Sequence, residues 1–150
     1  LSLSGCVYVS TGDTSHYGEF LDGKYSLNTV AGFYPEDLER VSEVKKYFFE
    51  YNVGFLDDEA QVILDCVYTP EQYGKEIERI KALNYSYSYY PADENSIFQY
   101  PAYAMSVKQD CYEYVLLIEE EHRMVYIHLE YYPSDSVQFD KSFLPKGYEW

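Results

Sequence analysis

The clearest structural pattern in the chain lies in residues 60–84, which read AQVILDCVYTPEQYGKEIERIKALN. In the first nine residues a strongly apolar set alternates with a mixed set, a pattern typical of a strand in a sheet that is covered on one side. Thr69 and Gln72 then form a capping box, with Pro70 at the first helical position. We therefore expect a strand at 60–68, followed at once by a helix at 70–83.

The predicted helix has one apolar face. Tyr73, Ile77, Ile80 and Leu83 recur at spacings of four, three and three, and charged residues occupy the opposite face. Asn84 supplies a left-handed stop. Since the apolar face has no side chain typical of a catalytic or metal site, we expect this helix to cover a sheet.

Further strands are predicted on both sides of this segment. Three β-rich runs follow the helix, at 102–108, 112–119 and 124–132. Upstream, the pattern predicts a short helix at 36–43 that leads into a strand at 44–52. The result is a two-layer α+β domain with a single antiparallel sheet of about five strands, one main covering helix and a short N-terminal helix.

Alternation also predicts which side chains of the last strand face the core. Val125, Ile127, Leu129 and Tyr131 form the apolar set. The other face, which we expect to be exposed to solvent, carries Tyr126, His128 and Glu130.

Composition restricts the class of partner. The 150 residues include 26 acidic and 11 basic side chains, which gives a net charge of −15. Nucleic acids and anionic membrane surfaces need clustered positive charge, so both are disfavoured as partners. Apolar residues make up 47% of the chain, enough for one core. The apolar runs are far shorter than the roughly 20 residues of a transmembrane helix. We expect one globular domain over residues 7–150.

The first residues carry a short motif, Leu3-Ser4-Gly5-Cys6. It resembles the lipobox of bacterial lipoproteins, in which the cysteine receives a diacylglycerol and the preceding residues are removed. The resemblance implies that residues 1–6 are the remnant of a signal and anchor. It also implies lipidation at Cys6 and an extracytoplasmic location, with a lipid anchor as the only membrane contact. Alternatively, this segment begins a strand or apolar arm of a cytoplasmic protein, with Cys6 as a small buried side chain.

Two further cysteines are present. If Cys6 is modified, Cys66 and Cys111 remain as a possible disulfide pair. Both lie in or beside predicted strands, so reduced thiols in the core are the alternative. The sequence leaves both states open.

The residue types of catalytic and metal sites are sparse. His16 follows Asp13 and Ser15 in a polar turn, but local adjacency does not make a catalytic triad, and no GxSxG elbow is present. His128 and Glu130 share one strand face, yet a zinc site would need a third ligand. The acidic stretches at 57–59 and 93–95 lack the alternating spacing of a calcium loop. We predict no catalytic residue, no metal site and no cofactor.

Tyrosine is the unusual feature of the chain, which contains 20 of them. Tyr85, Tyr87, Tyr89 and Tyr90 lie close together and are the candidate ligand-binding residues. A tyrosine ring offers a flat apolar face and a polar tip, which suits stacking on sugars or anchoring a protein partner. The same alternation also fits an edge strand with one buried face.

Two functions follow from these features. The first is a non-catalytic, lipid-anchored extracytoplasmic module that binds a protein or a glycan through exposed tyrosines. The second is a small acidic intracellular protein, of the inhibitor or immunity type, that neutralises a basic partner. Its motivation is the charge of −15, which steers association with cationic surfaces.

Overall fold

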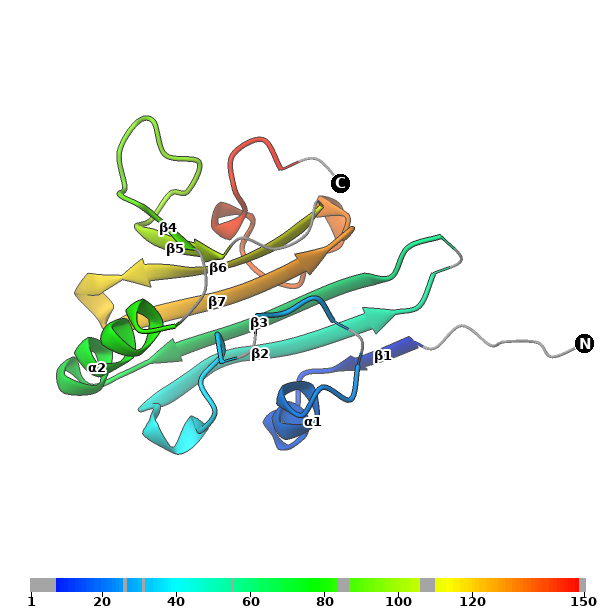
Figure 1. The fold of residues 1–150 in the computed structure, drawn as a ribbon, viewed down its shortest axis with the longest axis horizontal. Coiled ribbons are helices and arrows are strands. Elements are labelled where there is room, and N and C mark those ends of the chain that lie inside the picture. Colours follow the sequence, from blue (N-terminus) through cyan, green and yellow to red (C-terminus); the bar gives the residue numbers. More distant parts are fainter. Residues whose placement is uncertain are drawn as a thin grey trace, which may run out of the picture.

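A computed structural model describes residues 8–25, 27–30, 32–54, 56–83, 87–105 and 110–148. In these residues one antiparallel sheet has the strand order β1-β2-β3-β7-β6-β5-β4 (Figure 1). The strands are β1 (Tyr8–Thr11), β2 (Glu43–Asn52), β3 (Glu59–Val67), β4 (Tyr87–Tyr90), β5 (Ala102–Met105), β6 (Cys111–Ile118) and β7 (Arg123–Glu130). The helices are α1 (Tyr17–Leu21) and α2 (Pro70–Lys81).

The sheet is built from two antiparallel units that meet at its centre. Strands β1 to β3 form the first unit, and β4 to β7 form the second. Helix α2 carries the chain from β3 to the neighbourhood of the outermost strand, β4, and the chain then returns strand by strand to the centre (Figure 1). There β7 pairs with β3, from Ala60 opposite Glu130 to Val67 opposite Arg123.

Helix α2 confirms the strongest prediction from the sequence. The Thr69 hydroxyl accepts a hydrogen bond from the Gln72 amide at 3.2 Å, so the predicted cap is formed. Tyr73 and Ile80 are buried against the sheet. The helix ends at Lys81, two residues before the predicted end. The α+β class and the single antiparallel sheet are likewise confirmed.

Two of the predicted elements differ from the structure. Within the described residues the sheet has seven strands rather than about five, because β1 and β4 add a four-residue strand at each edge. The predicted helix at 36–43 is only a 3₁₀ turn over Leu38–Arg40, and the N-terminal helix is α1 instead. The Ser42 amide already donates to the Val67 carbonyl at 2.8 Å. Pairing with β3 thus begins where a helix would have continued.

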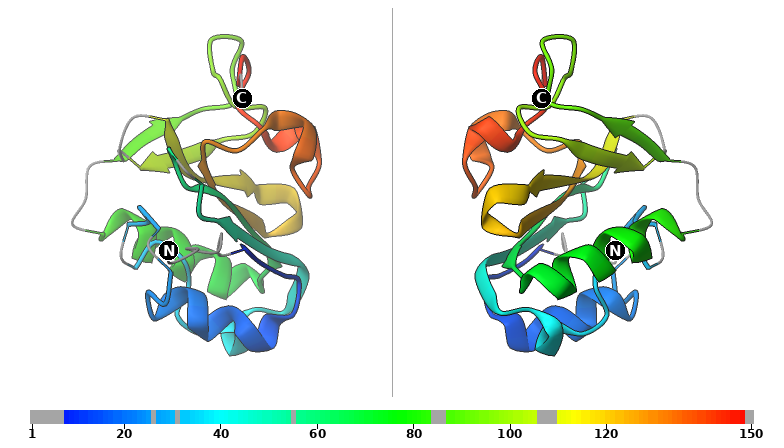
Figure 2. Two further views of the ribbon diagram at one scale, coloured as in Figure 1. Left: turned by 90° about the vertical axis from the view of Figure 1, so that its right-hand side faces the viewer. Right: turned by 90° about the vertical axis from the view of Figure 1, so that its left-hand side faces the viewer.

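Both faces of the sheet are covered, one by the helical layer and the other by irregular segments of the chain. Helices α1 and α2 and residues 27–30 and 32–34 cover one face (Figure 2). On the other face, Phe98 and the C-terminal residues Tyr132 and Phe143 pack over Ile63 and Ile127. The alternation of residues along a strand shows which side chains share a face. It does not show whether another segment of the chain covers that face.

The expected solvent face of β7 is therefore wrong as well. Tyr126 and His128 have no exposed surface, and Glu130 is 2% exposed. These side chains lie under the helical layer, so three titratable groups are buried where we expected a surface exposed to solvent.

Candidate functional site

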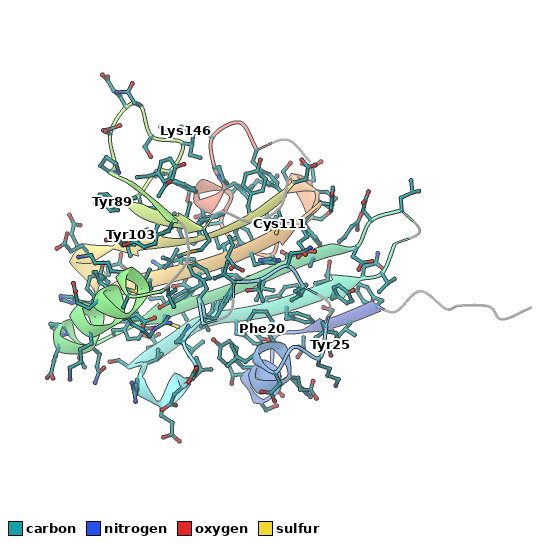
Figure 3. The ribbon with its side chains drawn as sticks, viewed as in Figure 1. Phe20, Tyr25, Tyr89, Tyr103, Cys111 and Lys146 are labelled. Carbon is teal, nitrogen blue, oxygen red and sulfur yellow. The ribbon has the colours of Figure 1, made fainter. Side chains whose placement is uncertain are left out.

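The exposed aromatic site lies at the β4–β5 end of the sheet and is made of Tyr87, Tyr89 and Tyr103, which we call the tyrosine edge. Tyr89 is 52% exposed, and Tyr103 beneath it is buried. The ring of Tyr103 lies 5.1 Å from that of Tyr89 and 5.4 Å from that of Tyr87, measured between centroids. Figure 3 shows Tyr89 and Tyr103 together at this end of the sheet, away from Phe20 of α1 and the nearby Tyr25.

Local packing holds the tyrosine edge in place. Tyr89 is directly opposite Tyr103 in the antiparallel register, so cross-strand contact fixes its ring. The Tyr87 hydroxyl donates to the Lys81 carbonyl at 3.5 Å, which links β4 to the end of α2. Burial raises the pKa of Tyr103. The exposed ring of Tyr89 therefore packs against a side chain that is itself buried and held in place.

The predicted group of four tyrosines does not form one surface. Tyr90 points to the other face of the sheet, where its ring centroid lies 5.1 Å from that of Phe98. Tyr85 lies outside the described residues. Tyr87 and Tyr89 are the members that share a face, and Tyr103, absent from the prediction, completes the cluster. The sequence did hold an indication of this contact, because Tyr103 lies in the next β-rich run, at 102–108, which can pair with the strand that carries Tyr89.

A second feature is a buried polar cluster of Cys111, Glu113, His128 and Glu130. The His128 ring lies between two carboxylates, with Nδ1 at 2.7 Å from Glu113 Oε2 and Nε2 at 2.9 Å from Glu130 Oε1. Cys111 Sγ lies 3.9 Å from both His128 Nε2 and Glu130 Oε1. The β6–β7 register produces this meeting, because Glu113 is opposite His128 and Cys111 is opposite Glu130.

Both nitrogens of the His128 ring face a carboxylate oxygen. An ionised carboxylate only accepts hydrogen bonds, so this arrangement favours the charged form of the imidazole. Burial lowers the pKa of His128, but its bonds with Cys111, Glu113 and Glu130 outweigh burial and raise that pKa well above its ordinary value. Burial raises the pKa of Glu130, and the bonds from His128 and Asn28 overcome it, so the net shift is downward.

The same carboxylates fasten the chain that covers them. Glu130 Oε1 accepts the Asn28 amide at 2.5 Å, and Glu113 accepts the Val30 amide and the Thr29 hydroxyl, each at 2.6 Å. Residues 28–30 are thus bound to the sheet by hydrogen bonds to ionised groups, which are stronger than bonds between neutral groups.

The two described cysteines are free thiols, which corrects the possible pairing of Cys66 with Cys111. Cys66 is opposite Met124 in β7, whereas Cys111 is opposite Glu130. These positions on β7 are about 20 Å apart at the rise of a strand, far beyond the reach of a disulfide. Burial raises the pKa of both thiols. Cys6, the predicted lipidation residue, lies outside the described residues.

A cleft of about 440 Å³ lies between α2 and the chain at 32–40. The Arg79 guanidinium lines it, bonded to Glu76, to the Gly32 carbonyl and, at 2.9 Å, to the Phe33 carbonyl. Tyr126 donates to Glu76 at 2.6 Å. Because Arg79 and Glu76 already have these partners, we interpret the polar groups of the cleft as contacts that hold α2 against residues 32–33 and the sheet.

The remaining polar candidates lie apart from both features. His16 pairs with Glu19 at 3.3 Å on the surface, and His122 occupies a left-handed turn. In the predicted acidic loops, Asp58 accepts the Tyr51 hydroxyl at 2.8 Å and Asp93 accepts the Asn95 amide at 2.9 Å.

Comparison of the chain with models of protein families, with curated proteins and with solved structures gives no match. None of the helices in the described residues is long and apolar enough to cross a membrane.

Sequence reasoning missed Glu113 and the position of Cys111 beside His128. A signal was present, since Glu113 interrupts an apolar strand, as His128 does in the next one. A charged residue inside such a run indicates a buried partner.

Proposed function

We propose that the protein is a lipid-anchored extracytoplasmic binding module that holds an extended, basic protein segment at the tyrosine edge. The observation that carries the proposal is the half-exposed ring of Tyr89 on the last strand of the sheet, supported from below by Tyr103. The resemblance of residues 3–6 to a lipobox supports the anchor.

An extended segment suits this surface because strand addition uses backbone hydrogen bonds at a sheet edge. Among the described residues, β4 pairs with β5 alone, so its outer side presents backbone donors and acceptors. No charged residue or proline interrupts β4, although both commonly protect edge strands. Tyr87 and Tyr89 on one face would anchor alternate side chains of the added segment.

The charge of the chain favours a basic segment. The net charge is −15, and seven of the 11 basic side chains are engaged in ion pairs with acidic groups of the same chain. The resulting negative field accelerates encounters with a positively charged partner and makes them sensitive to salt.

The test compares two exposed tyrosines at opposite edges of the sheet. An array of short basic peptides, a matched array with acidic residues in place of the basic ones, and a glycan array are probed with three proteins. These are wild type, Tyr89→Ala and, as the matched control, Tyr8→Ala, since Tyr8 is 61% exposed on β1. We expect wild type and Tyr8→Ala to bind basic peptides, and Tyr89→Ala to bind them at least about tenfold more weakly.

Other results contradict the proposal in distinct ways. If the protein binds glycans in a way that depends on Tyr89 and binds no peptide, the tyrosine edge would still be the binding surface, but its ligand would be a glycan and not a basic peptide. Equal binding by wild type and Tyr89→Ala, or no binding to any array, would reject the tyrosine edge.

The acidic intracellular inhibitor remains a second candidate, favoured by the same unbalanced charge. The location separates the two proposals. Intact mass of the product of the complete gene, recovered from bacterial membranes, should show diacylation at Cys6 and loss of residues 1–5. An unmodified cytosolic chain would instead favour the inhibitor.

A further inference from the structure

We propose that Cys111, His128 and Glu130 form a zinc-binding site, with Glu113 as the residue that orients the imidazole. This site does not depend on the tyrosine edge or on the lipid anchor. It supplies the third ligand that the sequence pattern of His128 and Glu130 lacked.

The three ligand atoms are grouped closely enough for one ion. Cys111 Sγ, His128 Nε2 and a Glu130 oxygen all lie within 4.8 Å of one another. Ideal tetrahedral zinc, with bonds of about 2.0 Å to nitrogen and oxygen and about 2.3 Å to sulfur, places its ligand atoms about 3.3–3.6 Å apart. The observed separations of 2.9 Å between nitrogen and oxygen and 3.9 Å to sulfur bracket that range. Small side-chain shifts would complete the geometry.

Glu113 contacts the nitrogen that a metal would not use. Its Oε2 lies 2.7 Å from His128 Nδ1, on the opposite side of the ring from Cys111 and Glu130. A metal-bound histidine commonly donates its other N–H to a carboxylate, which fixes the ring and increases its basicity. Hydrogen bonds from Thr29 and Val30 hold Glu113 itself.

Zinc binding balances in charge and protons. Zn²⁺ would displace the thiol proton of Cys111 and any proton on His128 Nε2, and these protons would pass to the buffer. The Cys111 thiolate and the Glu130 carboxylate would together offset the two positive charges of the ion, which keeps its desolvation cost low in this buried place.

The chemistry of the ligands favours zinc. Thiolate, imidazole and carboxylate together suit this borderline-soft ion, whereas calcium and magnesium prefer oxygen alone. Cys111 is half-buried and the other members are buried, so we expect the ion to enter from the cysteine side. The fourth position would be taken by water.

The experiment uses reduced protein in a Cys6→Ser background, which removes the third thiol. Cobalt(II) serves as a spectroscopic substitute for zinc, and equilibrium dialysis measures the bound zinc. We expect one equivalent of zinc per chain, release of protons on binding, and a near-ultraviolet band from thiolate bound to cobalt.

Cysteine variants assign the site. Cys111→Ser should abolish the thiolate band. The matched control Cys66→Ala should retain it, because Cys66 lies in β3 opposite Met124, near the start of β7, whereas the proposed site lies at the end of β7. Cys111→Ser loses only two long contacts and should stay folded, which circular dichroism verifies. Glu113→Gln should keep the band and weaken zinc affinity about 10–100-fold, as expected of a positioning residue.

Two results would overturn the proposal. One is the absence of bound zinc and of a thiolate band in folded, reduced wild type. The other is a band that survives in Cys111→Ser and disappears in Cys66→Ala. Either would leave the cluster as a metal-free bridge between the sheet and residues 28–30.

Discussion

At the scale of single residues, two neighbouring tyrosines have opposite hydrogen-bonding states. The rings of Tyr34 and Tyr126 lie 5.7 Å apart and both are buried. The Tyr126 hydroxyl donates to Glu76 at 2.6 Å and lies 3.0 Å from that of Tyr68. The Tyr34 hydroxyl has no hydrogen-bond partner in the described part of the chain. An unpaired buried hydroxyl costs free energy, whereas a bond to a carboxylate stabilises the fold.

The same substitution should therefore have opposite effects at these positions. We expect Tyr126→Phe to lower the free energy of unfolding by about 1–3 kcal/mol, because Glu76 loses a charged hydrogen bond. Tyr34→Phe should leave stability unchanged or raise it by about 1 kcal/mol. Urea unfolding followed by circular dichroism measures both. An equal loss in the two variants would show that Tyr34 has a partner.

At the scale of elements, an ion pair fastens the central strands. Arg123 of β7 donates to Asp65 of β3 through Nε at 2.8 Å and Nη2 at 2.7 Å, and the Asp65 side chain is 7% exposed. The guanidinium also lies 5.6 Å from the ring centre of Phe143, in the covering C-terminal segment. The pair therefore joins two strands and the layer above them.

Removal of Arg123 should be costly because Asp65 would remain buried without its partner. We expect Arg123→Ala to destabilise the protein by about 3–5 kcal/mol. The control is Lys75→Ala on α2, whose pair with Glu71 is exposed, and it should leave stability nearly unchanged. Thermal unfolding of both variants provides the comparison. A small effect at Arg123 would mean that water reaches Asp65.

At the scale of the whole molecule, the buried tyrosines make stability sensitive to alkaline pH. Burial raises the pKa of Tyr51 and Tyr73 to about 12, and it raises those of Tyr34, Tyr114 and Tyr126 well above their ordinary value. Above about pH 10 the unfolded chain loses phenolic protons that the folded chain retains. The unfolded state then binds fewer protons, so stability falls as pH rises.

We expect the free energy of unfolding to fall by on the order of 1 kcal/mol per buried tyrosine for each pH unit above 10. Urea unfolding at several pH values measures the loss, and ultraviolet absorbance of tyrosinate follows ionisation. The buried tyrosines should ionise together with unfolding. Ionisation of all 20 tyrosines near pH 10 in a folded chain would contradict the expectation.

Sequence reasoning identified the elements whose signals are local. The Thr69 cap and the apolar face of α2 act within a few residues of each other, and strand alternation in β3 and β7 is equally local. The short strands β1 and β4 entered only as alternative interpretations, an N-terminal strand or arm and a tyrosine-bearing edge strand. Four residues offer little pattern, and their pairing partners lie elsewhere in the chain.

Capping, alternation and composition need no distant partner, so the amino-acid sequence was enough to establish the α+β class, helix α2, the central strands and the negative charge of the chain. Which side chains meet depends instead on how distant parts of the chain fold together. Glu113 and Cys111 come to His128 and Glu130 through the register of β6 on β7, and residues 28–30 cover them. A sheet face becomes buried only when another part of the chain folds over it, so its chemistry follows from contacts between residues far apart in sequence.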